Sequence, residues 1–147
     1  MELQEIHKEI LALCVDDYTE LWLVIHRMSK DAYPRDSMPT WVRQKTLEVI
    51  DDLLHCGLIS IGDFWGKPKF KPMSVTVTEA IDYIERIWDD LGHTPTIGDG
   101  CWFKATSDGE QLVHELGISE QASYLDITPE TLVFSAFSAS KTPGIPE

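Results

Sequence analysis

Basic residues are scarce in this chain, and they are scarcest in its second half. Lysine and arginine number 12 against 25 aspartates and glutamates, which gives a formal net charge of −13. Residues 73–147 hold 13 acidic and 3 basic side chains, whereas residues 1–72 hold 12 and 9. A surface of this sign repels a phosphate backbone, so the composition argues against nucleic acid as a partner.

Cysteine is also rare. The three cysteines are odd in number, far apart in the sequence and surrounded by apolar neighbours: Cys14, Cys56 and Cys101. This pattern argues against both a disulfide framework and a Cys-x-x-Cys metal site. We therefore expect buried thiols in a reducing cytoplasm.

Long apolar runs are absent. The chain opens with the acidic stretch Met1-Glu2-Leu3-Gln4-Glu5, and nowhere do 18 apolar residues follow one another. We expect neither an export signal nor a membrane span, and hence a cytoplasmic location. The 147 residues, 43% of them hydrophobic, can bury a core unaided. One domain over residues 1–137 is expected, with a flexible tail at 138–147.

Apolar residues at helical spacing predict helices over residues 3–13, 18–28 and 41–56. Asp16 and Asp17 offer a break and an N-cap before the second helix, and Gly57 ends the third. The strongest helix signal covers 77–91, where a capping box precedes it and Gly92 follows it. We expect its apolar stripe to be buried: Ile81, Ile84 and Trp88.

The rest of the chain predicts a small sheet and two further helices. Residues 58–61 and 101–103 have strand patterns, and 62–72 is expected to form a hairpin or wing. A second capping box, Ser107 with Glu110, opens a helix that ends at Gly117, and Thr128-Pro129 starts a short helix to about 137. The predicted fold class is α+β, mostly helical, with a small antiparallel sheet.

Two stretches, Leu47 to Ile59 and Trp102 to Leu116, resemble winged-helix domains of bacterial regulators. In that family a recognition helix runs into a Gly-Leu-Ile turn and the first wing strand, and a Thr-x-x-Gly motif after the second strand caps a helix. Residues 57–59 and 106–109 match these motifs. About forty residues, with the helix at 77–91, separate the two strands, so the resemblance implies a helical insertion.

The chain is also similar to a group of small bacterial proteins without an assigned activity. These share an Ile-x-x-x-Trp helix, a Pro-x-x-Gly-Asp loop and a Trp-Phe strand, which here are residues 84–88, 95–99 and 102–103. This similarity implies no function.

The winged-helix resemblance implies a DNA-binding transcriptional regulator that reads DNA with helix 41–56. It would act as a dimer through residues 3–14 or the C-terminal segment. Its candidate DNA contacts are Arg43, Lys45, Lys67, Lys69 and Lys71. Three acids on the same helix, Glu48, Asp51 and Asp52, would face phosphates, and the five cations can equally serve to solubilise an acidic protein.

Two other patches are candidates for a protein interface. The first is the aromatic wing, Phe64, Trp65 and Phe70, which could anchor a partner, stack on nucleobases, or close the core over the wing. The second is the carboxylate pair Asp89 and Asp90, which would steer a basic protein toward the acidic half.

Metal binding and catalysis have little support. His93, Asp99 and Cys101 fall within nine residues but at no known ligand spacing. His55 and Cys56 are helix neighbours and so point about 100° apart. No Gly-rich phosphate loop, Gly-x-Ser-x-Gly or His-Glu-x-x-His motif occurs. We expect no metal, no cofactor and no enzymatic activity, and we interpret the chain as a protein-interaction module of immunity or antitoxin type.

Overall fold

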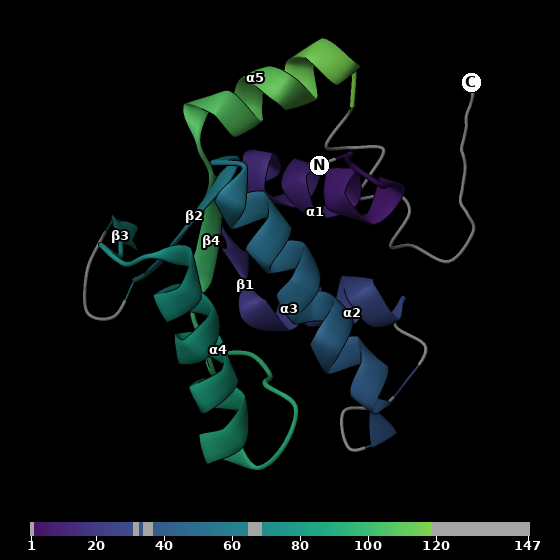
Figure 1. Cartoon of the computed structure of the whole chain (residues 1–147), viewed down its shortest axis with the longest axis vertical. Helices are drawn as coiled ribbons and strands as arrows, with labels where there is room; N and C mark the ends of the chain where they lie inside the picture. Colours follow the sequence, from purple (N-terminus) through teal and green to yellow (C-terminus); the bar gives the residue numbers. More distant parts are fainter. Residues whose placement is uncertain (1, 31–32, 34–36, 65–68, 119–147) are drawn as a thin grey trace.

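The computed structural model describes residues 2–30, 33, 37–64 and 69–118. Within these ranges it has five helices and a four-stranded sheet, which confirms the predicted α+β, mostly helical class (Figure 1). The helices are α1 (Glu5–Asp16), α2 (Leu21–Ser29), α3 (Thr40–His55), α4 (Val77–Leu91) and α5 (Ser107–Leu116). The strands are β1 (Thr19–Glu20), β2 (Ile59–Asp63), β3 (Lys71–Pro72) and β4 (Trp102–Ala105). The predicted helix 128–137 and the tail lie outside the described residues.

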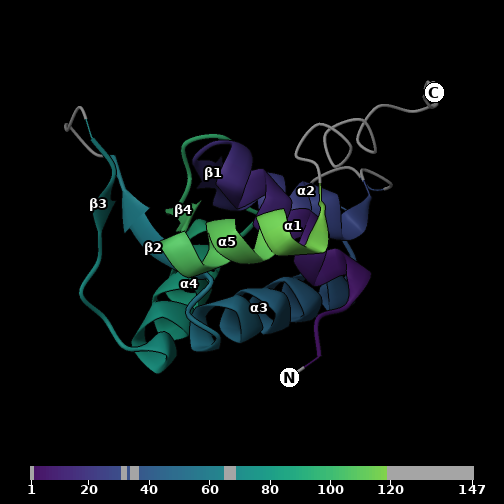
Figure 2. The ribbon, with the colours of Figure 1, turned by 90° about the horizontal axis from the view of Figure 1, so that it is seen from above.

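The sheet has the order β1-β4-β2-β3, and every neighbouring pair is antiparallel. Ile61 lies opposite Phe103, and Gly62 lies opposite Trp102. β3 and α4 are inserted between the two central strands, as the spacing of the sequence predicts. The β2–β3 hairpin projects away from α1 and α2 in both views (Figures 1 and 2).

The core lies between one face of the sheet and the helices. α3 packs against α1 and α2 on one side and against α4 on the other, and α5 lies along α1. The largest side chains buried there include Phe103, Ile10, Leu11, Leu21, Ile25, Ile50, Leu53 and Ile84. None of the helices in the described ranges is both long enough and apolar enough to cross a membrane.

The second helix begins later than the sequence predicts. Tyr18 precedes β1 and is 37% exposed, and α2 starts only at Leu21 with Glu20 as its N-cap. Asp17 is the C-cap of α1, so the predicted N-cap role for it is wrong. The physical reason is the pairing of Thr19 with Phe103, because this non-local contact holds residues 19 and 20 extended despite their helical pattern.

The helix α4 follows its prediction closely. The Thr76 hydroxyl accepts from the Glu79 N–H at 3.1 Å, and the Glu79 carboxylate accepts from the Thr76 N–H at 2.8 Å. Gly92 ends the helix at a φ of +71°, which glycine adopts without strain. Ile84 and Trp88 are buried as predicted, whereas Ile81 is only partly buried.

The first turn of α5 uses a different cap from the predicted Ser107–Glu110 box. The N-cap is Thr106, whose hydroxyl accepts from the Gly109 N–H at 3.1 Å. This is the Thr-x-x-Gly arrangement that the winged-helix resemblance implies. Position 109 also requires glycine, because a Cβ there would lie 2.1 Å from the Leu58 carbonyl oxygen.

Candidate interaction surfaces

The cation nearest the start of α3 is held by α4. The Arg43 guanidinium lies 2.9 Å from an Asp89 oxygen and 3.7 Å from a Glu85 oxygen, and it sits 5.4 Å from the centre of the Trp88 ring. Arg43 is 28% exposed at its side chain. These four groups, which we call the Arg43 seam, join the two helices. The winged-helix resemblance implies that Arg43 contacts DNA, whereas here its charge is paired with carboxylates of α4.

The remaining candidate DNA contacts that the structure describes do not form a continuous positive stripe. Lys45 pairs with Glu48 of its own helix at 3.1 Å. Lys69 and Lys71 are exposed at β3, whereas Lys67 lies outside the described residues. The start of α3 is at the end of the helix away from β3 in both views (Figures 1 and 2). Asp51 and Asp52 follow Lys45 on α3, and the four described cations fall into two separate pairs, Arg43 with Lys45 and Lys69 with Lys71.

Both aspartates of α3 are hydrogen-bonded within the protein. Asp52 accepts from buried His7 at 2.9 Å, and this bond joins α1 to α3. The Gln4 N–H donates to His7 Nδ1 at 3.1 Å, so Nε2 carries the proton that Asp52 accepts. Asp51 pairs with His55 on the surface.

The outward side of α4 carries exposed carboxylates. The helix has five acidic residues and one basic residue, Arg86. The exposed members, which we call the α4 acidic face, are Glu79, Asp82, Asp89 and Asp90. The structure separates the two neighbours that the sequence groups together, because Asp89 pairs with Arg43 while Asp90 is exposed one position further along the helix.

The aromatic wing extends into a larger aromatic cluster on the sheet. Phe64 lies edge-on to Tyr18 and Trp102, with ring centres 4.8 and 5.2 Å apart, and Phe70 stacks on Tyr18 at 5.2 Å. Lys104 lies over the Tyr18 ring at 5.1 Å. These rings pack against one another, as expected of side chains that cover the sheet beneath the wing. This packing fits a structural role better than stacking on nucleobases. Trp65 lies outside the described residues.

Gly62 lies beneath this aromatic cluster. A Cβ at this position would lie 2.3 Å from the Lys71 carbonyl oxygen and 2.6 Å from the Phe70 ring. The missing side chain therefore lets Phe70 lie across the strand. Sequence reasoning missed Tyr18 and Trp102 because their place beside the wing depends on the strand register.

In the described part of the chain, no group of three or more His, Cys, Asp or Glu side chains is placed to hold a metal ion. His93 contacts the Thr94 carbonyl, and Asp99 accepts from Thr96, so both serve the local turn. Cys101 is fully buried.

Two of the three thiols are buried as predicted, and one is not. Burial raises the pKa of Cys14 and of Cys101 to about 12, so neither forms a thiolate at neutral pH. Cys56 is exposed, and its predicted burial is wrong. It is the C-cap of α3, where the chain turns at Gly57 and leaves the apolar stripe of the helix.

Comparison with protein-family models, with curated proteins and with solved structures finds no match.

Proposed function

We propose that the chain is a non-enzymatic protein-binding module, and that the α4 acidic face binds a basic protein partner. Immunity proteins and antitoxins are the kind of protein that acts in this way. The buried thiols Cys14 and Cys101 fit a reducing compartment such as the cytoplasm.

The observation that carries this proposal is the seam around Arg43. α4 packs on α3, the helix that a winged-helix regulator would use to read DNA, and two α4 carboxylates neutralise its cation. A phosphate backbone that approached this surface would meet four exposed acids of α4 against one exposed cation, Arg86. Charge of this sign attracts a basic protein and accelerates its association.

The scaffold itself supports a winged-helix origin as part of the proposal. β2 follows α3 through Gly57, pairs with β4, and β4 runs into the Thr106 cap of α5. These are the connections that the resemblance implies for the two wing strands. On this interpretation the inserted α4 replaces a DNA-binding surface with a protein-binding one.

The test is the association rate of a partner captured from the native cell extract and then purified. The variant Asp82→Lys/Asp90→Lys reverses two exposed charges of the α4 acidic face without touching the Arg43 seam. The control Glu2→Lys/Asp16→Lys makes the same change in net charge at exposed positions at the two ends of the α1 region. Rates are measured by biolayer interferometry at about 20 mM and about 150 mM salt.

We expect the α4 variant to associate about tenfold more slowly at low salt, and the control by less than about threefold. The difference should shrink at high salt because exposed charges are screened. Equal slowing in both variants would show that only net charge matters and would contradict a binding face on α4. Capture of duplex DNA in place of a protein would favour the alternative, a dimeric transcriptional regulator.

A further inference from the structure

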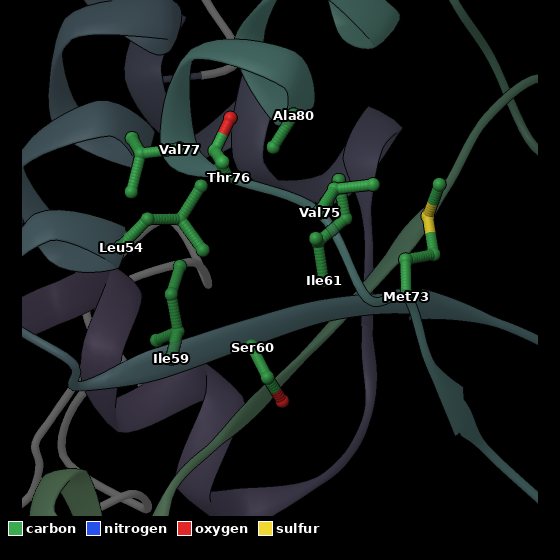
Figure 3. A pocket seen from close by; sticks show the side chains of 9 residues that line it. All are labelled: Leu54, Ile59, Ser60, Ile61, Met73, Val75, Thr76, Val77 and Ala80. Atoms are coloured by element: carbon green, nitrogen blue, oxygen red, sulfur yellow. The ribbon is translucent and has the colours of Figure 1, made fainter.

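A narrow groove opens beside the first turn of α4 (Figure 3). Its volume is about 190 Å³. Strand β2 and the end of α3 form one side, and the segment that leads from β3 into α4 forms the other. Apolar side chains face one another across the groove, Leu54, Ile59 and Ile61 on one side and Val75, Val77 and Ala80 on the other, and polar atoms contribute to its lining as well.

The strand at the floor of this groove has an incompletely paired edge. β2 pairs with β4 from Ile59 to Gly62 but with β3 only at Gly62 and Asp63. The Met73 N–H still donates to the Ile61 carbonyl at 2.9 Å, and the chain then turns toward α4.

The direction of the backbone groups follows from the neighbouring bonds. The Thr106 N–H donates to the Leu58 carbonyl, so Leu58 faces β4. Successive backbone groups of a strand alternate in direction, so Ile59 directs its N–H and its C=O to the opposite edge, past the point where pairing with β3 ends. Ile59 is 3% exposed, so only an extended chain that lies within the groove can pair with this edge.

One carboxylate lies near the groove. Thr76 lines the groove, and its backbone N–H donates to the Glu79 carboxylate. Val75, which also lines the groove, is 40% exposed. Glu79 is the first member of the α4 acidic face, whose other members follow along the helix from this turn.

We propose that this groove binds an extended basic segment of the protein partner. One apolar side chain of the segment enters the groove, its backbone pairs with Ile59, and its cationic neighbours face Glu79 and the rest of the α4 acidic face. The inference rests on the proposed function, which supplies a basic protein as the partner, and adds to it where and in what conformation that partner docks.

The first test uses a fluorescein-labelled peptide of alternating lysine and leucine, followed by fluorescence anisotropy. We expect saturable binding that an alternating glutamate–leucine peptide does not show. Val75→Arg places a cation at the mouth of the groove and should weaken binding at least tenfold. Ile97→Arg is the matched control, because Ile97 is an apolar residue, 73% exposed, on the loop between α4 and β4. Circular dichroism confirms that both variants are folded.

The second readout separates pairing with the strand edge from simple apolar contact. The same peptide, N-methylated at alternate positions on the edge that would face β2, should bind at least tenfold more weakly than one methylated on the other edge. The Ile59 amide should exchange its hydrogen more slowly when the unmodified peptide is bound. Equal affinity of the two methylated peptides, or equal losses in Val75→Arg and Ile97→Arg, would overturn the proposal.

Measurements with the captured partner distinguish failure of the groove proposal from failure of the proposed function. If Asp82→Lys/Asp90→Lys slows association and Val75→Arg leaves affinity unchanged, the groove proposal is wrong and the acidic face stands. If Val75→Arg abolishes peptide binding but no partner responds to the charges of α4, the proposed function is wrong and the groove remains a site for a basic peptide.

Discussion

Arg43 of α3 and Asp89 of α4 lie 2.9 Å apart and join the two helices at the surface. The same guanidinium sits over the Trp88 ring, which is 7% exposed. Arg43 therefore shields the edge of the core and neutralises an acid of the inserted helix. A cation with both roles is poorly available to a phosphate.

Trp88→Ala should reduce the free energy of unfolding by about 3 to 5 kcal/mol, as truncation of a buried aromatic does. Urea denaturation measures the loss. Trp41→Ala is the control, because Trp41 is 48% exposed at the start of α3 and its loss should cost below about 1 kcal/mol. Equal costs for the two tryptophans would contradict the burial of the α4 stripe.

Gly62→Ala should destabilise the protein by about 1 to 3 kcal/mol, because its Cβ would meet the backbone oxygen of Lys71, which cannot move aside as a flexible side chain does. The near-ultraviolet circular dichroism should change as well, since Phe70 must leave its place over the strand. Phe70→Leu keeps the glycine and should alter the spectrum at a smaller cost in stability. An unchanged spectrum in Gly62→Ala would contradict the packing of the aromatic cluster.

Helix α4 could be predicted from the sequence because its determinants are local. Its cap, its terminator and its buried stripe at intervals of four residues all lie within residues 76–92. β1 could not be predicted, because it has two residues and exists only through pairing with β4 more than eighty positions away. The exposure of Cys56 could not be predicted for a related reason: the apolar stripe of α3 continues in the sequence past the point where the chain turns.

The candidate surfaces were only partly visible in the sequence. Phe64 and Phe70 are close in the chain, so composition alone suggested an aromatic patch, whereas Tyr18 and Trp102 join it through the sheet. Glu85 and Asp89 are four residues apart and flank Trp88, a spacing that could have indicated a shared helix face. Their partner Arg43 could not be found in this way, because the pairing depends on how α3 and α4 pack.

Alkaline pH should destabilise the protein through its buried thiols. Cys14 and Cys101 have a pKa of about 12 in the folded chain, against an ordinary value of 9.0 for an unfolded one. As pH rises through 9.0, the unfolded thiols lose protons that the folded ones keep, so stability falls by up to about 1.4 kcal/mol per pH unit for each thiol. This contribution is fully present below pH 9.0 and is lost toward pH 12.

The measurement is urea denaturation under reducing conditions at pH 8, 9 and 10. Tyr83, whose pKa burial raises from 10.0, adds to the loss of stability near pH 10, because the unfolded tyrosine ionises first, and the cysteine variant separates the two contributions. Cys14→Ala/Cys101→Ala should show a flatter dependence on pH. A slope unchanged in this double variant would contradict the assignment.

Random duplex DNA should not bind at micromolar protein concentration and physiological salt. The net charge is −13, and Arg43 is engaged by Glu85 and Asp89, so few counterions can be released on contact. Fluorescence anisotropy of labelled DNA tests this directly. Tight binding whose affinity falls steeply with salt would favour the transcriptional regulator over the protein-binding module.

The neighbours Asp89 and Asp90 should respond in opposite ways to charge reversal. Asp89→Lys removes the ion pair with Arg43 and places two cations together, so it should cost about 1 kcal/mol of stability despite the exposure of the aspartate. Asp90→Lys removes a negative charge from the C-terminal end of α4, where the helix dipole opposes it, and should change stability by less than about 0.5 kcal/mol or raise it slightly.

If Asp90 serves partner binding, its reversal should nevertheless slow association, so the two measurements separate a structural carboxylate from a functional one. Thermal denaturation of the single variants, repeated at about 1 M salt to screen the exposed charges, provides the stability comparison. Equal destabilisation by both variants would show that the Arg43 seam does not distinguish the two aspartates.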